Sequence, residues 1–195
     1  MKNQKTVLNI GSGRNSIHQD TDFFAGWCEI RADIAQVNPD VVTDIRTLEN
    51  VSDQSVDAIW ASHVIEHCHW HEQPMIMNSF RRVLKSQGFA VIKVPDLGAL
   101  SDHIQHDLLK PVYHLPNGVG ITAIDILYGH RPALDPTCPI YNPAMNHRMG
   151  FNFKLLQQLI QQHEFNGVIR RHDFELTAVI WKTSCPEILT NNINF

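Results

Sequence analysis

A glycine turn follows directly on a short apolar run near the start of the chain. Residues 6–10 read Thr-Val-Leu-Asn-Ile, which is typical of a buried strand, and Gly11, Ser12 and Gly13 come next. A turn of this composition lets the backbone approach a ligand closely and directs free N–H groups at it. Asp33 stands 20 residues beyond Gly13, where a second strand is expected to end. An acid at that place in a nucleotide-binding α/β fold typically accepts hydrogen bonds from ribose hydroxyls, so the two features together predict a nucleotide site.

The residues after the turn distinguish two kinds of nucleotide cofactor. A dinucleotide fingerprint needs a glycine or alanine at position 16, where close helix packing requires it, and this chain has Ser16. Residues 14–26 also lack a clear amphipathic stripe for a crossover helix. Both features disfavour NAD as the ligand of the glycine turn.

A group of histidines with one glutamate follows the fourth expected strand and raises the possibility of a metal site. His63 and His67 are four residues apart, so on a helix they would share a face, as zinc ligands can. The order H-x-x-E-H resembles an inverted zincin motif, yet no clear distal carboxylate ligand follows in an appropriate helix. We therefore expect no metal, and a zinc-dependent hydrolase is the third of three functional hypotheses.

Apolar runs and turn signals alternate along the chain and indicate the elements that must position these residues. Strands are expected at residues 6–10, 28–34, 40–43, 56–61, 89–94, 168–169 and 176–181. One helix begins near Pro74, presents Ile76, Phe80, Val83 and Leu84 at helical spacing, and ends before Gly88; another is capped by Asn152. Near-continuous apolar strands separated by helices predict a doubly wound α/β fold with a mostly parallel, seven-stranded sheet.

Residues 96–150 differ in composition from the rest and are expected to form an irregular, partly helical insertion after the fifth strand. Four of the ten prolines of the chain fall within 12 residues here. We expect one domain over residues 1–195, with this insertion as a lid, because ligands of open parallel sheets bind beyond the carboxyl ends of the strands. The candidate substrate-binding residues within it are His130, Arg131, Tyr141 and His147.

Composition excludes several classes of protein. A net charge of −4 gives no electrostatic footprint for nucleic acid or an anionic membrane, and 43% hydrophobic residues exclude a disordered chain. No apolar run approaches the ~20 residues that a membrane helix requires. The four cysteines are scattered, which favours reduced thiols and a cytoplasmic location, whereas the oligomeric state cannot be read from the sequence.

Five segments, in their order and spacing, resemble the motifs of the class I, seven-strand S-adenosylmethionine-dependent methyltransferases. They are residues 7–13 (VLNIGSG), 29–33 (EIRAD), 39–45 (PDVVTDI), 55–67 (SVDAIWASHVIEH) and 80–96 (FRRVLKSQGFAVIKVPD). The last segment resembles the members that act on small molecules. The resemblance implies a Rossmann-like sheet, S-adenosylmethionine as cofactor, S-adenosylhomocysteine as product, and methyl transfer to an unidentified, small-molecule acceptor.

The resemblance also implies which residues hold the cofactor. Gly11 and Gly13 would lie against its methionine part, Asp33 would bind the ribose, and Asp44 and Ile45 would hold the adenine. The full set of implied cofactor residues is Asn9, Gly11, Ser12, Gly13, Asp33, Ile34, Asp44, Ile45, Ser62 and His63.

Three departures from the family's pattern motivate an alternative function. The acid often found two residues before the first glycine is Asn9 here, Asn15 replaces a third glycine, and the following helix is shortened or irregular. The alternative is a protein that binds the adenosyl cofactor without transferring its methyl group.

Two histidines are candidates for a catalytic base, which is needed only when the acceptor arrives protonated. They are His63, at the rim of the implied cofactor pocket, and His147 in the insertion. Imidazole suits the role because it titrates near neutral pH. A purely structural role is the competing interpretation for each.

Overall fold

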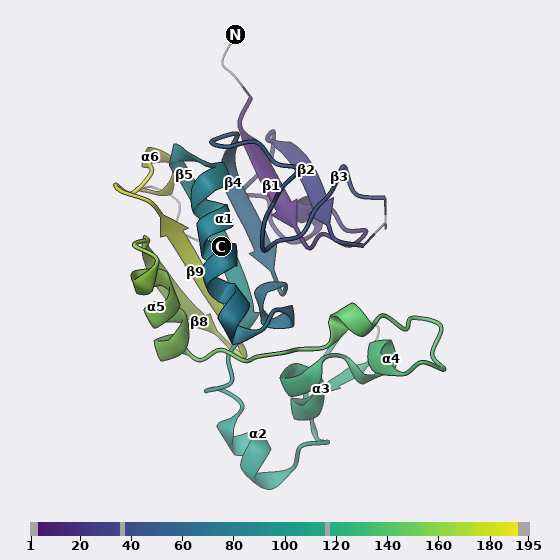
Figure 1. The fold of residues 1–195 in the computed structure, drawn as a ribbon. Helices are drawn as coiled ribbons and strands as arrows, with labels where there is room; N and C mark the ends of the chain where they lie inside the picture. Colours follow the sequence, from purple (N-terminus) through teal and green to yellow (C-terminus); the bar gives the residue numbers. More distant parts are fainter. Residues whose placement is uncertain (1–3, 36–37, 116–117, 191–195) are drawn as a thin grey trace.

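The computed structural model describes residues 4–35, 38–115 and 118–190 and contains one seven-stranded sheet. Its strands are β1 (Thr6–Ile10), β2 (Cys28–Asp33), β3 (Val41–Val42), β4 (Val56–Ser62), β5 (Leu84–Pro95), β8 (Asn166–His172) and β9 (Glu175–Trp181). The strand order is β3-β2-β1-β4-β5-β9-β8, and only the pairs of β9 with β5 and β8 are antiparallel. This arrangement confirms the predicted mostly parallel α/β fold (Figure 1).

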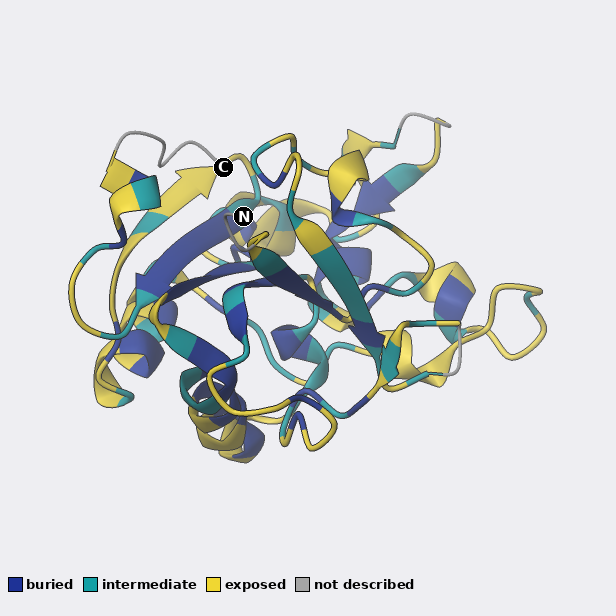
Figure 2. Ribbon diagram, turned by 90° about the horizontal axis from the view of Figure 1, so that it is seen from above, coloured by how far each residue is buried: buried dark blue, intermediate teal, exposed yellow. Residues whose placement is uncertain are grey.

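The central strands are buried on both sides, which explains why their sequences are almost continuously apolar. In β5, residues from Phe89 to Ile92 are at most 1% exposed. Figure 2 shows the same concentration of buried residues in the middle of the sheet.

Two helices, α1 (Gln73–Val83) and α5 (Phe153–Gln162), cover one face of the sheet (Figure 1). Ile76 and Phe80 of α1 are fully buried against it. Asn152 caps α5 as expected, since its Oδ1 accepts a hydrogen bond from the Leu155 N–H at 2.9 Å. The prediction that Leu84 belongs to the first helix is wrong: its backbone is extended at the helix C-cap, and it starts β5.

Aromatic side chains cover most of the other face, where a regular helix would be expected after β1. The chain forms only a 3₁₀ turn, Ile17–Gln19, before β2. Phe24 is fully buried and stacks on Phe89 with ring centroids 6.2 Å apart, and Trp60 packs edge-on against Phe24. The short helix α6 (Glu187–Thr190) completes this layer. The shortened helix was predicted from the sequence, and packed aromatic rings take its place.

The segment between β5 and α5 lies beyond the carboxyl ends of the parallel strands (Figure 1). It contains α2 (Ser101–His106), β6 (Pro111–His114), β7 (Gly120–Thr122), α3 (Ala123–Tyr128), α4 (Arg131–Leu134) and a 3₁₀ turn at Pro143–Met145. Leu100, Ile121, Ala123 and Ile126 form a small apolar core of its own. The partly helical character expected of this segment is confirmed by α2, α3 and α4, whereas the β6–β7 hairpin was not predicted. No helix in the described ranges is long and apolar enough to span a membrane.

Candidate functional site

Two cavities adjoin at the edge of the sheet where β1, β2 and β4 end. The smaller, about 300 Å³, is lined by the glycine turn and by residues that follow β2, β3 and β4. The larger, about 680 Å³, lies between the sheet edge and the segment of residues 96–150. His63, His67 and Met145 line both cavities, so these residues form the boundary between them.

The glycine turn forms one wall of the smaller cavity and is held by Asp33. Gly11 and Gly13 have φ angles of 70° and 54°, a region that glycine adopts readily and other residues rarely do. The Gly13 N–H donates to Asp33 Oδ2 and the Ala35 N–H to Asp33 Oδ1, each at 2.8 Å. Each carboxylate oxygen keeps a second lone pair, so Asp33 can both fix the turn and accept hydrogen bonds from a ligand.

A carboxylate stands beside Asn9, where the family's pattern has an acid in the strand itself. Asn9 Nδ2 donates to Glu29 Oε1 at 2.8 Å, and Glu29 also accepts from the Ser16 hydroxyl and the Ile17 N–H. Burial alone would raise the pKa of Glu29, but these hydrogen bonds lower it, so the carboxylate is ionised. Glu29 thus supplies the charge that Asn9 lacks and anchors the chain after the glycine turn, a role not predicted from the sequence.

An acid–base cluster forms the opposite wall. Hydrogen bonds from Arg46 lower the pKa of Asp44, and Arg46 also pairs with Glu72 at the start of α1. All three residues line the smaller cavity, next to Ile45. Asp44 therefore presents a charged carboxylate that is already shared with Arg46.

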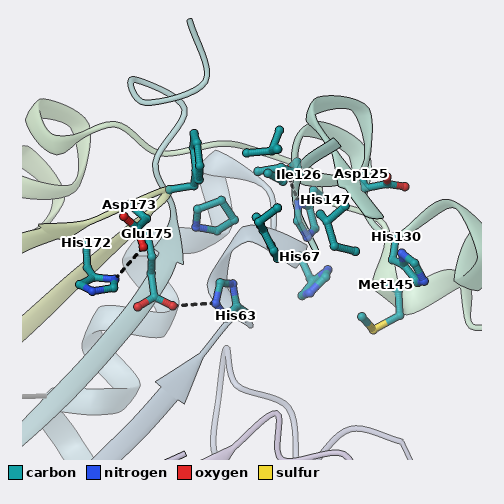
Figure 3. A pocket seen from close by; sticks show the side chains of 15 residues that line it. His63, His67, Asp125, Ile126, His130, Met145, His147, His172, Asp173 and Glu175 are labelled. Atoms are coloured by element: carbon teal, nitrogen blue, oxygen red, sulfur yellow. Dashed lines mark hydrogen bonds and ion pairs between the residues drawn. The ribbon is translucent and has the colours of Figure 1, made fainter. Parts of the chain in front are cut away.

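His63 lies at the boundary of the two cavities, between the carboxylates of Glu66 and Glu175, and Figure 3 shows its contact with Glu175. Its Nε2 is 3.0 Å from Glu175 Oε2 and its Nδ1 is 3.3 Å from Glu66 Oε1. Burial alone would lower the pKa of His63, but contacts with Glu175 and Glu66 raise it to about 9, although 48% of the side chain stays accessible. The ring is therefore protonated at neutral pH, which suits a hydrogen-bond donor rather than the base that we expected.

His147 has the opposite electrostatic environment. It lines the larger cavity, and burial lowers its pKa despite the nearby charge of Glu66, so the ring is neutral. Its Nδ1 is 2.8 Å from the Ile126 carbonyl oxygen, which can only accept. Nδ1 therefore carries the proton and Nε2 carries the lone pair.

The larger cavity combines apolar walls with a few polar groups. Ile121, Ile126 and Phe174 supply apolar surface, while His130 has a buried Nδ1 for which the described residues offer no hydrogen-bond partner. Glu175, at the start of β9, closes the side next to His63. Apolar walls with a few convergent polar groups are typical of small-molecule sites.

The structure brings together most, but not all, of the residues expected at the site. The smaller cavity is lined by Gly11, Gly13, Asp33, Ile34, Asp44, Ile45 and His63, and the larger by His63, His130 and His147. Asn9, Ser12, Ser62, Arg131 and Tyr141 lie outside the lining of both cavities.

The side chains outside the cavities have identifiable structural contacts. Asn9 is bonded to Glu29, and Arg131 forms an ion pair at 2.9 Å with the buried Asp125, which also accepts from Thr122. Tyr141 is 45% exposed. Arg131 thus stabilises the fold of the insertion rather than presenting its charge to the cavity.

Among the residues of the site that were not predicted are Arg46, Glu72 and Glu175. Glu175 had a usable signal, because it is an acid directly before the strand expected at residues 176–181. Arg46 and Glu72 had no such signal in the sequence, since the contact between them depends on how α1 packs.

Comparisons with known proteins agree with this fold. The family model described as a methyltransferase domain matches residues 21–92, from the turn before β2 into β5. No curated protein matches the chain.

Solved structures share the fold over nearly the whole chain. A S-adenosylmethionine-dependent methyltransferase from Archaeoglobus fulgidus is 14% identical, with a TM-score of 0.57 over 92% of this chain and 86% of that one. One from Methanosarcina mazei is 12% identical, with a TM-score of 0.60 over 94% and 95%. A Burkholderia thailandensis 1,6-didemethyltoxoflavin-N1-methyltransferase, solved with 1,6-didemethyltoxoflavin and S-adenosylhomocysteine, is 13% identical, with a TM-score of 0.58 over 93% and 72%. The chain therefore resembles the class I S-adenosylmethionine-dependent methyltransferases: a methyltransferase-domain model matches residues 21–92, and the fold is shared with solved structures of such enzymes.

Proposed function

We propose that this methyltransferase holds S-adenosylmethionine in the smaller cavity and transfers its methyl group to a small molecule in the larger one. The observation that supports this division most directly is the shared boundary of His63, His67 and Met145. A methyl group presented across that boundary would face an acceptor without either ligand leaving its own cavity.

The cofactor's orientation follows from the groups along the smaller cavity. Asp33 would accept the ribose hydroxyls, and the glycine turn would hold the methionine part. Ile45 would pack on the adenine, while the amino group of the adenine would share Asp44 with Arg46. In this pose the glycine turn and His63, which line the same cavity, would lie on either side of the sulfonium.

Transfer is an in-line displacement in which the cofactor supplies the electrophile. A lone pair of the acceptor would form a bond to the methyl carbon while the carbon–sulfur bond breaks. The electron pair of the carbon–sulfur bond would stay on sulfur, which gives S-adenosylhomocysteine. The protein's task is to bind both molecules, align them and exclude water. The insertion is placed to exclude water, because its returning end contributes to the walls of the two cavities through Asn142, Ala144, Met145, His147 and Arg148.

The acceptor is proposed to be a small molecule because the larger cavity is bounded on several sides and mostly apolar. Its residues come from the sheet edge and from β6, β7 and α3 of the insertion. The Burkholderia thailandensis enzyme, which shares the fold, is named for a small heterocyclic acceptor. A cytoplasmic location also stays a proposal, supported by four free cysteines, all within the described ranges.

His130→Ala is expected to weaken acceptor binding and leave cofactor binding within a few-fold of wild type. His130 lines the larger cavity but not the smaller one, and its buried Nδ1 has no partner among the described residues, so a small rotation of the ring would let an acceptor group satisfy it. A hydrogen bond of this kind is worth about 0.5–1.5 kcal/mol, or about 2–10-fold in KM. The assay is formation of S-adenosylhomocysteine with a panel of small phenols, amines, thiols and carbon acids.

The matched control is His106→Ala, which removes an exposed histidine of α2 outside both cavities. No turnover with any acceptor, together with tight cofactor binding, would favour the alternative of a cofactor-binding protein without activity. If His130→Ala and His106→Ala lost acceptor affinity equally, the acceptor would have to bind outside the larger cavity.

A further inference from the structure

Glu66, His67 and His147 converge on one point at the boundary of the two cavities. One ligand atom from each of the three side chains lies within 4.8 Å of the other two. Both imidazole rings line the larger cavity, with centroids 4.9 Å apart (Figure 3). His67 and His147 are 80 residues apart in the sequence, so the fold alone creates this group.

The Glu66 carboxylate is fully buried, and His63 is the one charged partner that the described residues give it. Its side chain is 1% exposed, and neither oxygen has a hydrogen-bond partner among the described residues. The nearest cation is His63, whose Nδ1 is 3.3 Å away and whose other nitrogen is bonded to Glu175. Buried carboxylates in proteins are normally hydrogen-bonded or bound to a metal, so Glu66 has room for a further partner.

Both histidines are held in the tautomer that a metal requires. Nδ1 of His67 is 3.2 Å from the Asn146 carbonyl oxygen, and Nδ1 of His147 is 2.8 Å from the Ile126 carbonyl oxygen. Because a carbonyl only accepts, each Nδ1 carries the proton and each Nε2 carries a lone pair. Metal-binding histidines are commonly fixed in this way, by a backbone carbonyl on the other ring nitrogen.

Main-chain hydrogen bonds fix the three residues relative to one another. The N–H groups of Arg148 and Met149 donate to the Glu66 carbonyl oxygen at 2.9 and 3.2 Å, and the His147 N–H donates to the Tyr128 carbonyl oxygen at 3.1 Å. The returning end of the insertion is thereby tied to the 3₁₀ turn Ile65–His67 that follows β4. The ligand arrangement is therefore largely preorganised.

We propose that Glu66, His67 and His147 bind a divalent transition-metal ion, with zinc as the best fit. Two imidazoles and one carboxylate suit zinc and iron, whereas magnesium and calcium prefer oxygen ligands alone. Donors bound to one zinc at about 2.0–2.1 Å lie roughly 3.4 Å apart. The three side chains need to close by little more than ~1 Å from their present spacing, which small rotations achieve.

A metal site of this composition differs from the one that the H-x-x-E-H motif suggests. The sequence suggested His63 and His67 as a ligand pair and lacked a distal ligand, so no metal was expected. The structure uses Glu66 and His67 of that motif and supplies His147 from the insertion as the third ligand. A metal with three protein ligands keeps a position free for an acceptor oxygen in the larger cavity and would replace His147 as the group that activates it.

The test is calorimetric titration of Zn²⁺ into protein that has been stripped with a chelator, with metal analysis of the untreated protein. We expect one zinc per chain. Glu66→Gln and His147→Ala should each weaken zinc affinity by at least about 10–100-fold, since each removes a ligand. The matched control is His71→Ala, which removes an exposed histidine four residues from His67 and should leave zinc affinity unchanged.

A second measurement separates loss of a ligand from loss of the fold. S-adenosylhomocysteine affinity and circular dichroism should stay close to wild type in His147→Ala, because the sheet and the glycine turn are untouched. If Glu66→Gln does not fold, His147→Ala decides the matter alone. Zinc binding that is absent in the wild type, or equal in wild type, His147→Ala and His71→Ala, would overturn the proposal, whether or not the protein methylates anything.

Discussion

Replacing Gly11 with alanine is expected to lower the melting temperature and to remove measurable cofactor binding. Gly11 has φ 70°, and an added Cβ would lie 2.6 Å from Val64 Cγ2 and 2.8 Å from Val64 Cβ. The left-handed backbone costs roughly 1–2 kcal/mol for a non-glycine residue, and overpacking against a β-branched side chain costs about 1–3 kcal/mol more. Val64 lines the smaller cavity, so its displacement changes the shape of the cofactor site itself.

Gly13→Ala is the matched control for this prediction. Gly13 has a similar φ of 54°, but a Cβ there meets no described atom within 4 Å. Gly13→Ala should therefore lose only the stability that a left-handed backbone costs a non-glycine residue, and its melting temperature should fall less than that of Gly11→Ala. Thermal unfolding and calorimetry with S-adenosylhomocysteine measure the two effects. Equal melting temperatures for the two variants would show that Gly11 is not packed against Val64.

Asp33→Ala is expected to weaken the binding of S-adenosylhomocysteine by about one to two orders of magnitude. The variant loses ribose hydrogen bonds to a charged group, worth roughly 1.5–3 kcal/mol, and frees the Gly13 and Ala35 N–H groups that order the turn. Asp33 lies at the end of β2, so the sheet should survive.

Asp33→Asn separates these contributions, because it keeps one acceptor oxygen and removes the charge. We expect its affinity to lie between those of wild type and Asp33→Ala. Asp40→Asn is a control, since Asp40 also caps a backbone N–H, that of Arg31, but does not line either cavity. Unchanged affinity in a folded Asp33→Ala protein would show that the ribose binds elsewhere.

The sequence predicted the sheet well because its central strands are buried on both faces. The apolar runs that end at Ile10 and Ser62 leave little alternative to interior strands. The first residues of β5 were missed because they pair with β4 only at its beginning, where the register shifts between Val56 and Ala58. The local pattern of apolar residues in the sequence gives no information about such a pairing.

The site was predictable where it depends on turns and strand ends that the topology of the sheet brings together. Gly11, Gly13 and Asp33 belong to a turn and a strand end that meet by the topology of the sheet. The role of Glu29 beside Asn9, and the approach of His147 to Glu66, depend on side chains from distant segments packing together. The protonation of His63 likewise depends on Glu175, 112 residues away. These contacts follow from tertiary structure, so motif and spacing could not reveal them.

The central claim, that the glycine turn binds an adenosyl cofactor, is tested most directly by thermal unfolding with added nucleotides. A ligand that binds only the folded chain stabilises it by about 2.7 kcal/mol at a concentration of 100 Kd. We predict that S-adenosylmethionine and S-adenosylhomocysteine each raise the melting temperature in a concentration-dependent manner, that NADH does not, and that Asp33→Ala abolishes most of the shift. A shift with NADH and none with either adenosyl compound would contradict the account.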